Sequence, residues 1–329
     1  MNQPGEFDLI ARFFAPLTLG APGAFNLCDD AAILPSRPGH ELVVTTDTLV
    51  SGIHFFGGLE PGLIAAKCLR VNLSDLAAMG AEPTYYTLSL GLPKEPKEDD
   101  CDEKWLHAFA EMLGDEQKLF GITLIGGDTV STPGPLMISI SAYGWVKTDQ
   151  FMKRNGACPG DKVFVSGTIG DAALGLKGEL SGDVDAYLSE RLHLPTPRVT
   201  AGLNLKHLAS AALDISDGLV QDLGHICRQS GASARICADD IPLSTSAQKL
   251  LSGNPHLRQT ILTGGDDYEL LFTVPYSRTG EIISISIELD LPMTQIGEII
   301  EAVSQPDVVV CDCNGEQVHL NETGWQHFR

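Results

Sequence analysis

The stretch Leu42–Gly80, LVVTTDTLVSGIHFFGGLEPGLIAAKCLRVNLSDLAAMG, decides which fold the chain can form. It opens with an apolar run that predicts a strand ending at Asp47, and Pro61 begins a helix-like segment that runs to Met79. That segment carries Asp75 among apolar residues. A carboxylate at the end of an apolar strand and another inside an apolar helix are costly to bury unless a positive charge pairs with them. A divalent cation is the simplest such charge, so this stretch predicts one wall of a metal site.

The composition describes a globular protein with enough material for a sizeable core. The 329 residues suffice for one large domain or two of ordinary size, and 43% hydrophobic with 20% charged residues is the usual balance of soluble domains. The formal net charge of −21 excludes an extended nucleic-acid or anionic-membrane surface, because both need a basic face. A phosphate-bearing substrate stays open, since carboxylates can hold Mg²⁺ and present its charge to phosphate.

The cysteines and the N-terminal residues indicate a cytoplasmic protein. Eight cysteines occur without a CxxC pair, so we expect reduced thiols rather than a zinc site or a disulfide framework. Residues 1–15 lack the basic and then apolar segments of a signal peptide. No apolar run approaches the roughly 18 residues of a membrane span. We therefore expect neither a membrane partner nor a nucleic-acid partner.

Strand-like and helix-like segments alternate in both halves of the chain. Turn residues cluster between Lys147 and Gly160, which predicts a boundary there, with one domain over residues 1–148 and a second over residues 149–329. In the first domain, a strand is expected over Ile122–Ile125 and is expected to end at the glycines before Asp128. The pattern predicts two α+β domains.

Acidic residues repeatedly follow an apolar or glycine-rich run. One such aspartate is usually a turn residue or a helix cap, but recurrence at six junctions favours a shared site. The residues are Asp30, Asp47, Asp75, Asp128, the pair Asp214 and Asp217, and the pair Asp266 and Asp267. Oxygen ligands without a Cys/His cluster favour Mg²⁺, and carboxylates around Mg²⁺ are typical of phosphoryl transfer from ATP.

The glycine-rich segments do not match a standard phosphate-binding loop. The chain has neither a Walker A sequence nor the glycine-rich loop and paired lysine of protein kinases. Gly167–Gly170, at a strand-to-helix junction, is compatible with an anion site made of backbone N–H groups and equally with a plain tight turn. The residues alone therefore predict a magnesium-dependent enzyme that acts on phosphates without a P-loop, and they leave the substrate open.

Several segments, in order along nearly the whole chain, carry a family resemblance. They are Asp29-Asp30-Ala31-Ala32, Thr45–Val50 with Gly52-Ile53-His54-Phe55, Lys67 with Val71–Ala81, Gly126-Gly127-Asp128-Thr129, Ser166–Asp171, Asp214–Leu219 and Gly265–Leu270. Together they resemble the thiamine-monophosphate kinase family, within the aminoimidazole ribonucleotide synthetase-like superfamily. The resemblance implies a homodimer in which the N-terminal sheets pair into a barrel-like interface, and an α/β C-terminal domain that completes the active site.

The resemblance also implies the reaction and the roles of residues. The reaction is ATP-dependent phosphorylation of thiamine monophosphate to thiamine diphosphate by direct in-line transfer, with several Mg²⁺ ions per active site. No general base or covalent nucleophile is implied, because the accepting phosphate oxygen is already anionic. Mg²⁺ would be held by Asp30, Thr45, Thr46, Asp47, Asp75, Asp128, Asp214 and Asp217; ATP would be contacted by Gly127, Asp128, Arg154 and Ser216; thiamine monophosphate would be contacted by His54, Glu269 and Trp325.

Ordinary structural roles remain open for several of these residues. His54 follows an apolar run and precedes two phenylalanines, so it is compatible with a packed aromatic neighbour. Trp325 is compatible with an apolar anchor as well as with a stacking surface for a cationic ring, and Arg154 with a solvated charge as well as with a phosphate contact. Cys28 stands where the family usually has glycine, and it would be strained if a glycine-only backbone angle were needed there.

Two other functions compete with the kinase. A selenophosphate synthetase would need a cysteine or selenocysteine with a nearby lysine in the N-terminal loop, and residues 1–27 contain no cysteine. A maturation factor that works through a protein partner, as in hydrogenase assembly, would carry a reactive C-terminal cysteine, whereas this sequence closes with Gln326-His327-Phe328-Arg329. A non-catalytic scaffold that binds Mg²⁺ and nucleotide has no feature in its favour.

Overall fold

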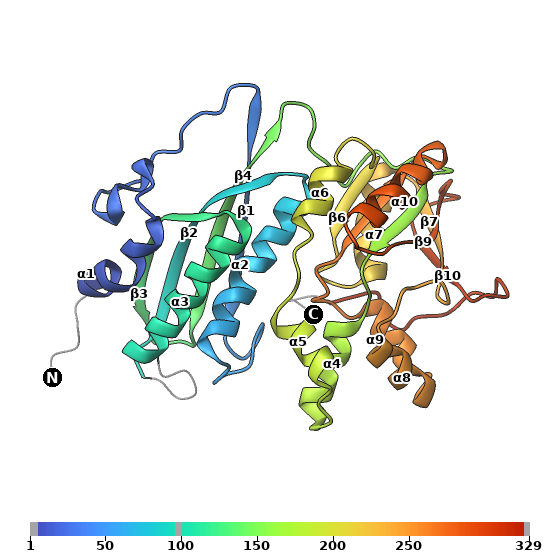
Figure 1. Cartoon of the computed structure of the whole chain (residues 1–329). Coiled ribbons are helices and arrows are strands. Elements are labelled where there is room, and N and C mark those ends of the chain that lie inside the picture. The colour runs from blue at the N-terminus through green and yellow to red at the C-terminus, as the bar shows by residue number, and fades with distance from the viewer. Residues whose placement is uncertain (1–5, 96–100, 326–329) are drawn as a thin grey trace. The chain divides into compact units, whose positions relative to one another are not determined.

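The computed structural model describes residues 6–95 and 101–325, which form two compact units (Figure 1). Unit 1 comprises Met1–Leu76 and Glu82–Thr148, and unit 2 comprises Ala77–Ala81 and Asp149–Arg329. Ala77 and Ala78 belong to unit 2 because they lie in the same buried cluster as Leu205 and Phe272. The predicted α+β class is confirmed. No helix in the described part of the chain is long and apolar enough to cross a membrane.

Unit 1 is a four-stranded sheet in the order β1-β4-β2-β3, with two long helices, α2 and α3 (Figure 1). Its elements are α1 (Glu6–Leu9), η1 (Ile10–Phe14), η2 (Ala15–Thr18), η3 (Pro22–Leu27), β1 (His40–Val50), α2 (Pro61–Ala78), β2 (Glu82–Pro93), α3 (Glu103–Phe120), β3 (Thr123–Thr132) and β4 (Met137–Lys147). The β1–β4 and β4–β2 pairs are antiparallel, and β2 and β3 are parallel. An ion pair of 2.8 Å between Arg70 of α2 and Glu116 of α3 joins the two helices.

β1 and β3 are longer than the sequence predicted, and this places two aspartates inside strands. Asp47 lies within the β1–β4 ladder, and Asp128 pairs with Ser89 in the β2–β3 ladder. The predictions that the first strand ends at Asp47 and the other at the glycines before Asp128 are wrong. Polar residues continue the pairing, because their side chains bond across the ladder: Thr46 Oγ and Ser141 Oγ lie 2.7 Å apart.

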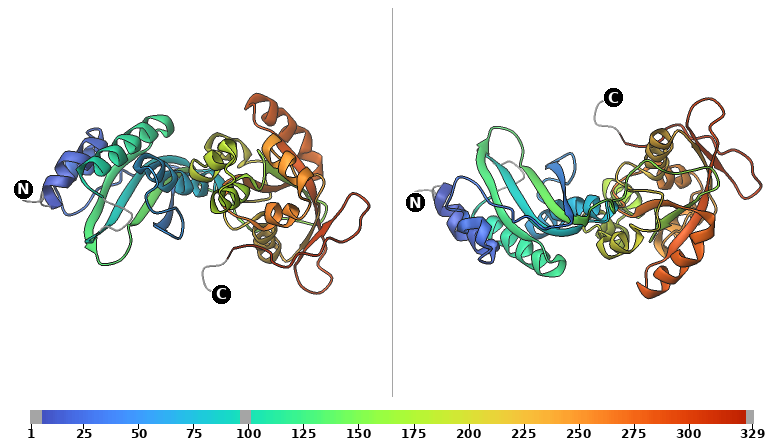
Figure 2. Two further views of the ribbon diagram at one scale, coloured as in Figure 1. Left: turned by 90° about the horizontal axis from the view of Figure 1, so that it is seen from below. Right: turned by 90° about the horizontal axis from the view of Figure 1, so that it is seen from above.

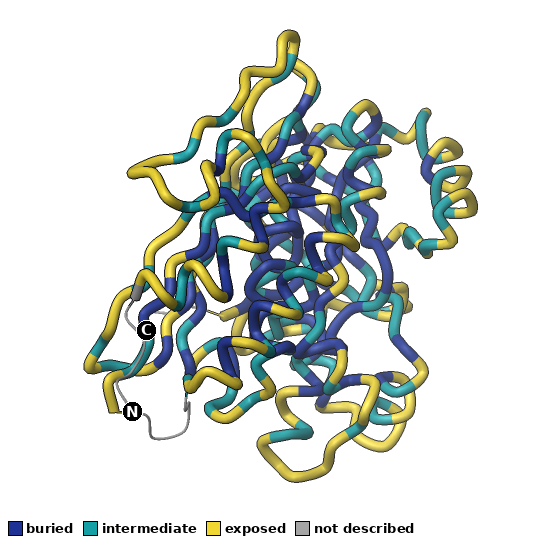
Figure 3. The backbone as a smooth tube through the Cα atoms, turned by 60° about the vertical axis from the view of Figure 1, so that its left-hand side comes forward, coloured by how far each residue is buried: buried dark blue, intermediate teal, exposed yellow. Residues whose placement is uncertain are grey.

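The two faces of this sheet differ because side chains alternate along each strand. One face carries the buried Leu88, Ile138 and Ile140 and is covered by α2 and α3. The opposite face carries the exposed Val44 and Met137 together with threonine and serine hydroxyls. Figure 3 shows the buried residues gathered in the interior and the exposed residues on the outer turns and loops. Unit 1 by itself therefore keeps one open sheet face.

Unit 2 is built on a six-stranded sheet in the order β10-β7-β9-β5-β8-β6. Its strands are β5 (Lys162–Ser166), β6 (Ala211–Asp214), β7 (Ser233–Cys237), β8 (Leu270–Val274), β9 (Met293–Ile300) and β10 (Val308–Cys311). Its helices are α4 (Asp171–Ser181), α5 (Ala186–His193), α6 (Val199–Leu205), α7 (Leu219–Ser230), α8 (Thr245–Gly253), α9 (Leu257–Thr263), η4 (Tyr276–Arg278) and α10 (Thr279–Glu288). Val163 packs in a core with residues of α7, whereas its neighbour Phe164 packs in a core with Ile282 of α10. Helices therefore cover both faces of this sheet (Figure 2).

Candidate functional site

The first cluster of predicted site residues lies where β1 faces α2 in unit 1. Thr45 and Asp47 are two residues apart on β1, so their side chains share the face that meets α2. Asn72 and Asp75 are three residues apart on α2, which puts them on one side of the helix. Thr45 Oγ donates a hydrogen bond to Asp75 Oδ2, and the Asp47 N–H donates to Asn72 Oδ1 at 3.1 Å. The structure thus brings Thr45, Asp47 and Asp75 together.

The electrostatics of this cluster suit a cation. Burial and the neighbouring Asp75 carboxylate raise the pKa of Asp47 from its ordinary value of 3.8 to about 7. A metal ion would offset that repulsion, and a donor set of carboxylate and hydroxyl oxygens suits Mg²⁺. These residues therefore fit the predicted ion. The Thr46 side chain lies on the opposite face of β1, beside Ser141, so it does not join them.

His54 lies in the tight turn that follows β1. The Val50 N–H donates to His54 Nδ1 at 2.9 Å, so a neutral ring carries its proton on Nε2. The Gly52 N–H closes the turn by donating to the Phe55 carbonyl at 2.8 Å, and Phe55 itself is buried. The backbone therefore orients the His54 ring, and its contact with substrate stays a prediction.

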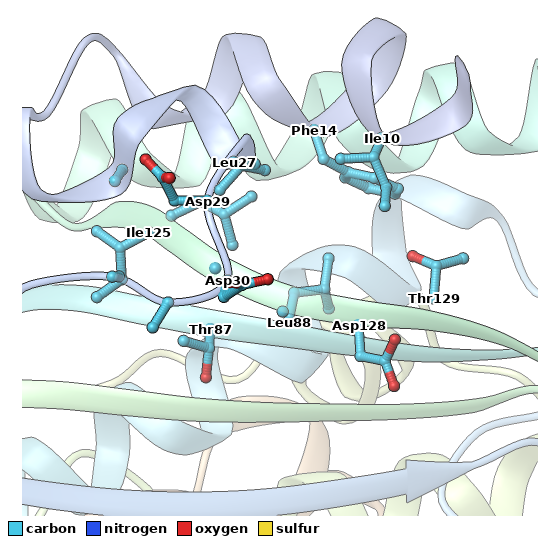
Figure 4. A pocket seen from close by; sticks show the side chains of 16 residues that line it. Ile10, Phe14, Leu27, Asp29, Asp30, Thr87, Leu88, Ile125, Asp128 and Thr129 are labelled. Atoms are coloured by element: carbon cyan, nitrogen blue, oxygen red, sulfur yellow. The ribbon is translucent and has the colours of Figure 1, made fainter. Parts of the chain in front are cut away.

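A cavity of about 260 Å³ lies beside the β2–β3 pair of unit 1 (Figure 4). Asp29, Asp30 and Asp128 line it together with the apolar Phe14 and Leu88. Figure 4 shows the Asp128 carboxylate on the opposite side of the strands from Asp29. The predicted ligands Asp30 and Asp128 therefore both line this cavity.

The backbone around this cavity requires glycine at position 127 and accepts cysteine at position 28. A Cβ on Gly127 would lie 1.8 Å from the Leu88 carbonyl oxygen, so any side chain there would push β3 away from β2. Cys28 has a φ of −105°, which every residue adopts, so the strain considered for a cysteine there is absent. The left-handed angles fall just before it, at Phe25, Asn26 and Leu27.

The second cluster lies in unit 2, in the loop between β6 and α7. The Asp222 carboxylate, in the first turn of α7, accepts the N–H groups of Ser216, Asp217 and Gly218 at 3.0–3.1 Å. Burial and the nearby Asp217 charge raise the pKa of Asp222 to about 7. Asp217, Asp222 and His225 offer ligand atoms within 4.8 Å of one another, the one such group of three or more among the residues that the structure describes. The loop is therefore folded around a buried acid.

Two residues of this cluster were missed by sequence reasoning, Asp222 and His225. The available signal was the place of Asp222 in the first turn of a helix, where backbone N–H groups need an acceptor. Arg154, a predicted ATP contact, is exposed and lies near this cluster. Burial and the charges of Arg228 and Arg154 lower the pKa of His225. Arg154, Ser216 and Asp217 therefore lie in one neighbourhood of unit 2. Asp214 is buried at the end of β6, paired with Leu270.

Trp325 joins the same neighbourhood through its backbone. Its N–H donates to the Asp217 carbonyl at 2.9 Å, and Gln221 Nε2 donates to the Trp325 carbonyl at 2.7 Å. The indole itself is 55% exposed, so it does not act as a buried anchor. An exposed ring beside the Asp217 loop is what a stacking surface requires.

The contact of Glu269 with thiamine monophosphate stays a prediction, and in the structure its side chain is occupied by neighbouring residues of unit 2. Glu269 is fully buried, and its carboxylate accepts bonds from Ser166, Arg191 and Arg198. The Gly167–Gly170 segment, considered above as an anion site, is hydrogen-bonded to a side chain of the protein itself. The Gly170 N–H donates to Asp267 Oδ2 at 2.6 Å. The polar group held by that turn is thus the chain's own Asp267 side chain.

Comparison with known proteins identifies the family. Two models match: AIR synthase related protein, N-terminal domain, over residues 28–146, and AIR synthase related protein, C-terminal domain, over residues 158–306. Curated relatives include the thiamine-monophosphate kinase of Caulobacter vibrioides, 41% identical over 98% of this chain and 91% of the relative. The thiamine-monophosphate kinase of Salmonella typhimurium is 40% identical over 98% of each chain.

Solved structures agree with these relatives. The thiamine-monophosphate kinase from Stenotrophomonas maltophilia is 42% identical, covers 88% of this chain and 90% of its own, and has a TM-score of 0.79. AaThiL complexed with AMPPCP and TMP is 30% identical over 100% and 99% of the two chains, with a TM-score of 0.76. The hydrogenase maturation protein HypE in complex with ATP has a TM-score of 0.79 at 20% identity, which shows a shared fold alone. Because the similarity at about 40% identity runs through both matched domains and nearly the whole length, the chain belongs to the thiamine-monophosphate kinase family.

Proposed function

We propose that this protein transfers the γ-phosphoryl group of ATP to thiamine monophosphate, forming thiamine diphosphate and ADP. The observation that carries the proposal is the full-length similarity to thiamine-monophosphate kinases in a chain whose Thr45, Asp47 and Asp75 meet in one oxygen-rich cluster. A related structure holds AMPPCP and TMP together, which supports both substrates. The HypE neighbours share the fold at about 20% identity and do not favour a maturation role.

We also assign Mg²⁺ to the reaction, with Thr45, Asp47 and Asp75 as ligands in unit 1 and Asp214 and Asp217 in unit 2. Mg²⁺ bound there would supply charge neutralisation for the phosphates. The contributions of the chain are binding and orientation, because an anionic phosphate oxygen needs no general base. Asp222 sets the Ser216–Gly218 backbone, the proposed nucleotide loop, by accepting its three N–H groups. His54 and the exposed Trp325 ring are the proposed contacts for thiamine monophosphate.

The direct test is ADP formation from ATP and Mg²⁺, measured with and without thiamine monophosphate. We expect release of ADP that depends on thiamine monophosphate, together with thiamine diphosphate in a one-to-one ratio. Thiamine and selenide serve as control acceptors, because neither offers an anionic phosphate oxygen. ADP release that ignores thiamine monophosphate, or that responds to selenide, would reject the proposed function.

A homodimer through the open sheet face of unit 1 is proposed as well. The exposed apolar residues Val44 (54%), Val130 (49%) and Met137 (41%) support it, because such side chains on a flat sheet favour burial by a second sheet. We expect light scattering to give twice the chain mass for the protein and a single chain mass for Val44→Glu. The matched control is Ile287→Glu, which changes an exposed isoleucine of α10 in unit 2 and is expected to stay dimeric. A monomeric parent protein, or a dimer that Val44→Glu leaves intact, would rule out this interface.

The location that we propose is the cytoplasm. The eight cysteines are free thiols in the structure, and a reducing compartment keeps thiols in that state.

A further inference from the structure

A buried ion cluster in unit 2 surrounds Glu269. The carboxylate has no exposed surface and accepts hydrogen bonds from Ser166 Oγ at 2.6 Å, Arg198 Nε at 2.7 Å and Arg191 Nη2 at 2.9 Å. Arg198 forms a second bond through Nη2 at 2.5 Å, so its fork binds both carboxylate oxygens. The arginine side chains are themselves only 10% (Arg191) and 19% (Arg198) exposed.

Such a cluster is a poor device for stability alone. Removing two guanidinium groups and a carboxylate from water is costly, and well-packed apolar residues often stabilise a core at least as well. What the cluster does provide is a fixed geometry, because a bidentate arginine fixes the carboxylate in position and orientation. The relevant question is therefore which backbone Glu269 holds.

Glu269 ends a segment that is bonded directly to the proposed nucleotide loop. The Ile215 N–H donates to the Glu269 carbonyl at 2.9 Å, and the Tyr268 N–H donates to the Ile215 carbonyl at 2.8 Å. The Asp266 N–H donates to the Ser216 carbonyl at 2.9 Å. A Cβ on Gly265 would lie 2.2 Å from the same Ser216 oxygen, so the two backbones are in closest contact there. Residues 265–269 therefore form the wall against which residues 215–216 are set.

This segment is strained and needs to be held. Asp266 has a φ of 70° and Tyr268 a φ of 52°. These left-handed angles are unfavourable for a residue with a side chain and persist only when the surroundings enforce them. Arg191 Nη2 also donates to the Asp267 carbonyl at 3.2 Å. The Asp267 carboxylate accepts the N–H groups of Gly170 at 2.6 Å and Ala172 at 3.3 Å. Buried polar contacts thus fix the segment between and beside its two strained residues.

We propose that Arg191 and Arg198 are positioning residues: through Glu269 they hold the 265–269 segment, and through it the Ile215–Asp217 backbone, in the arrangement that binds Mg²⁺ and nucleotide. The inference rests on the proposed kinase function. It gives Glu269 an internal role in place of a contact with thiamine monophosphate. Loss of the clamp should therefore weaken nucleotide and metal binding and leave the affinity for thiamine monophosphate nearly unchanged.

The test measures KM for ATP at saturating thiamine monophosphate, KM for thiamine monophosphate at saturating ATP, and the half-saturating Mg²⁺ concentration. The variants are Arg198→Met, Arg198→Lys and Glu269→Gln. We expect Arg198→Met and Glu269→Gln to raise the ATP and Mg²⁺ values by roughly tenfold, with the thiamine monophosphate value within about twofold of the parent. Arg198→Lys keeps the charge without the fork, so it is expected to lie between parent and Arg198→Met. Arg278→Met is the matched control, because Arg278 pairs with Glu281 on the exposed surface of the same unit.

Two outcomes would overturn the proposal. A rise in KM for thiamine monophosphate with an unchanged KM for ATP would show that Glu269 contacts the substrate directly. A fall in Tm with all three values unchanged would show a purely structural cluster. If Arg198→Met does not fold, the Arg198→Lys and Glu269→Gln values decide. Calorimetric titration with Mg–ADP measures the change in nucleotide affinity without turnover. A parent protein that lacks thiamine-monophosphate kinase activity would therefore reject the proposed function, while the titration would still test the positioning role of Arg191 and Arg198.

Discussion

Replacing Asp47 with Asn is expected to lower turnover of thiamine monophosphate by roughly 10³-fold and to leave the folded structure intact. Asp47 and Asp75 are brought together by β1 and α2, and burial beside Asp75 raises the pKa of Asp47 to about 7. Two adjacent carboxylates in a partly buried site are held there against their repulsion, which is the arrangement expected of metal ligands. Asn has the shape of Asp without the charge, so Asp47→Asn removes charge from the cluster and little else.

The measurement is kcat at saturating ATP, thiamine monophosphate and Mg²⁺, with circular dichroism and gel filtration to confirm the fold. Asp115→Asn is the matched control, since it makes the same chemical change in an exposed residue of α3 that pairs with Lys118. Asp115→Asn is expected to keep kcat within about twofold of the parent, as surface ion pairs of this kind contribute little. Near-normal turnover of Asp47→Asn at saturating Mg²⁺ would remove Asp47 from the metal ligands.

The sequence could predict the meeting of Asp47 and Asp75 because both lie in regular elements with clear patterns. The helix expected from Pro61 to Met79 is observed as Pro61–Ala78, and its spacing puts Asn72 and Asp75 on one side. The ends of β1 and β3 could not be predicted from apolar runs. Thr, Ser and Gly continue those strands because partner strands supply backbone and hydroxyl bonds, and a partner strand is not visible in local sequence.

The surroundings of Glu269 and Asp222 show a second limit. Arg191 and Arg198 lie 78 and 71 residues before Glu269, so the sequence gives no local sign that the carboxylate is enclosed. Asp222 carries a local sign, its place at a helix start, but its three donors follow from a loop conformation that depends on the whole unit. Family resemblance names the positions in a motif. Only the packing shows whether a side chain points outward to a ligand or inward to its neighbours.

The metal-free protein is expected to lose stability as the pH rises from about 4 to about 7, and Mg²⁺ is expected to restore it. The pKa of Asp47 is 3.8 in an ordinary setting and about 7 in the folded chain, so in this window the folded state binds more protons than the unfolded state. The free energy of unfolding therefore falls as the pH rises through the window and levels off above about 7. The whole shift in the pKa of Asp47 would correspond to about 4 kcal/mol in the free energy of unfolding. Water near the half-buried carboxylate reduces the expected contribution of Asp47 to roughly 1–2 kcal/mol.

Asp47→Asn isolates this contribution, because Asp222 and Asp267 also have raised pKa values and add pH dependence of the same sign. We expect urea unfolding in EDTA to show a smaller loss of stability between pH 4 and pH 8 for Asp47→Asn than for the parent, by the roughly 1–2 kcal/mol given above. With Mg²⁺ at about 100 times its Kd, the parent is expected to gain about 2.7 kcal/mol at pH 8, and Asp47→Asn much less. Asp115→Asn should follow the parent in both conditions.

Equal pH dependence in the parent and Asp47→Asn would show that Asp47 is ionised without penalty, and the electrostatic case for a cation beside Asp75 would then fail. We expect the parent to gain stability from Mg²⁺ at pH 8, and Asp47→Asn to be more stable than the parent without Mg²⁺ but inactive. Together these results would show that the repulsion between Asp47 and Asp75 serves metal binding rather than the fold.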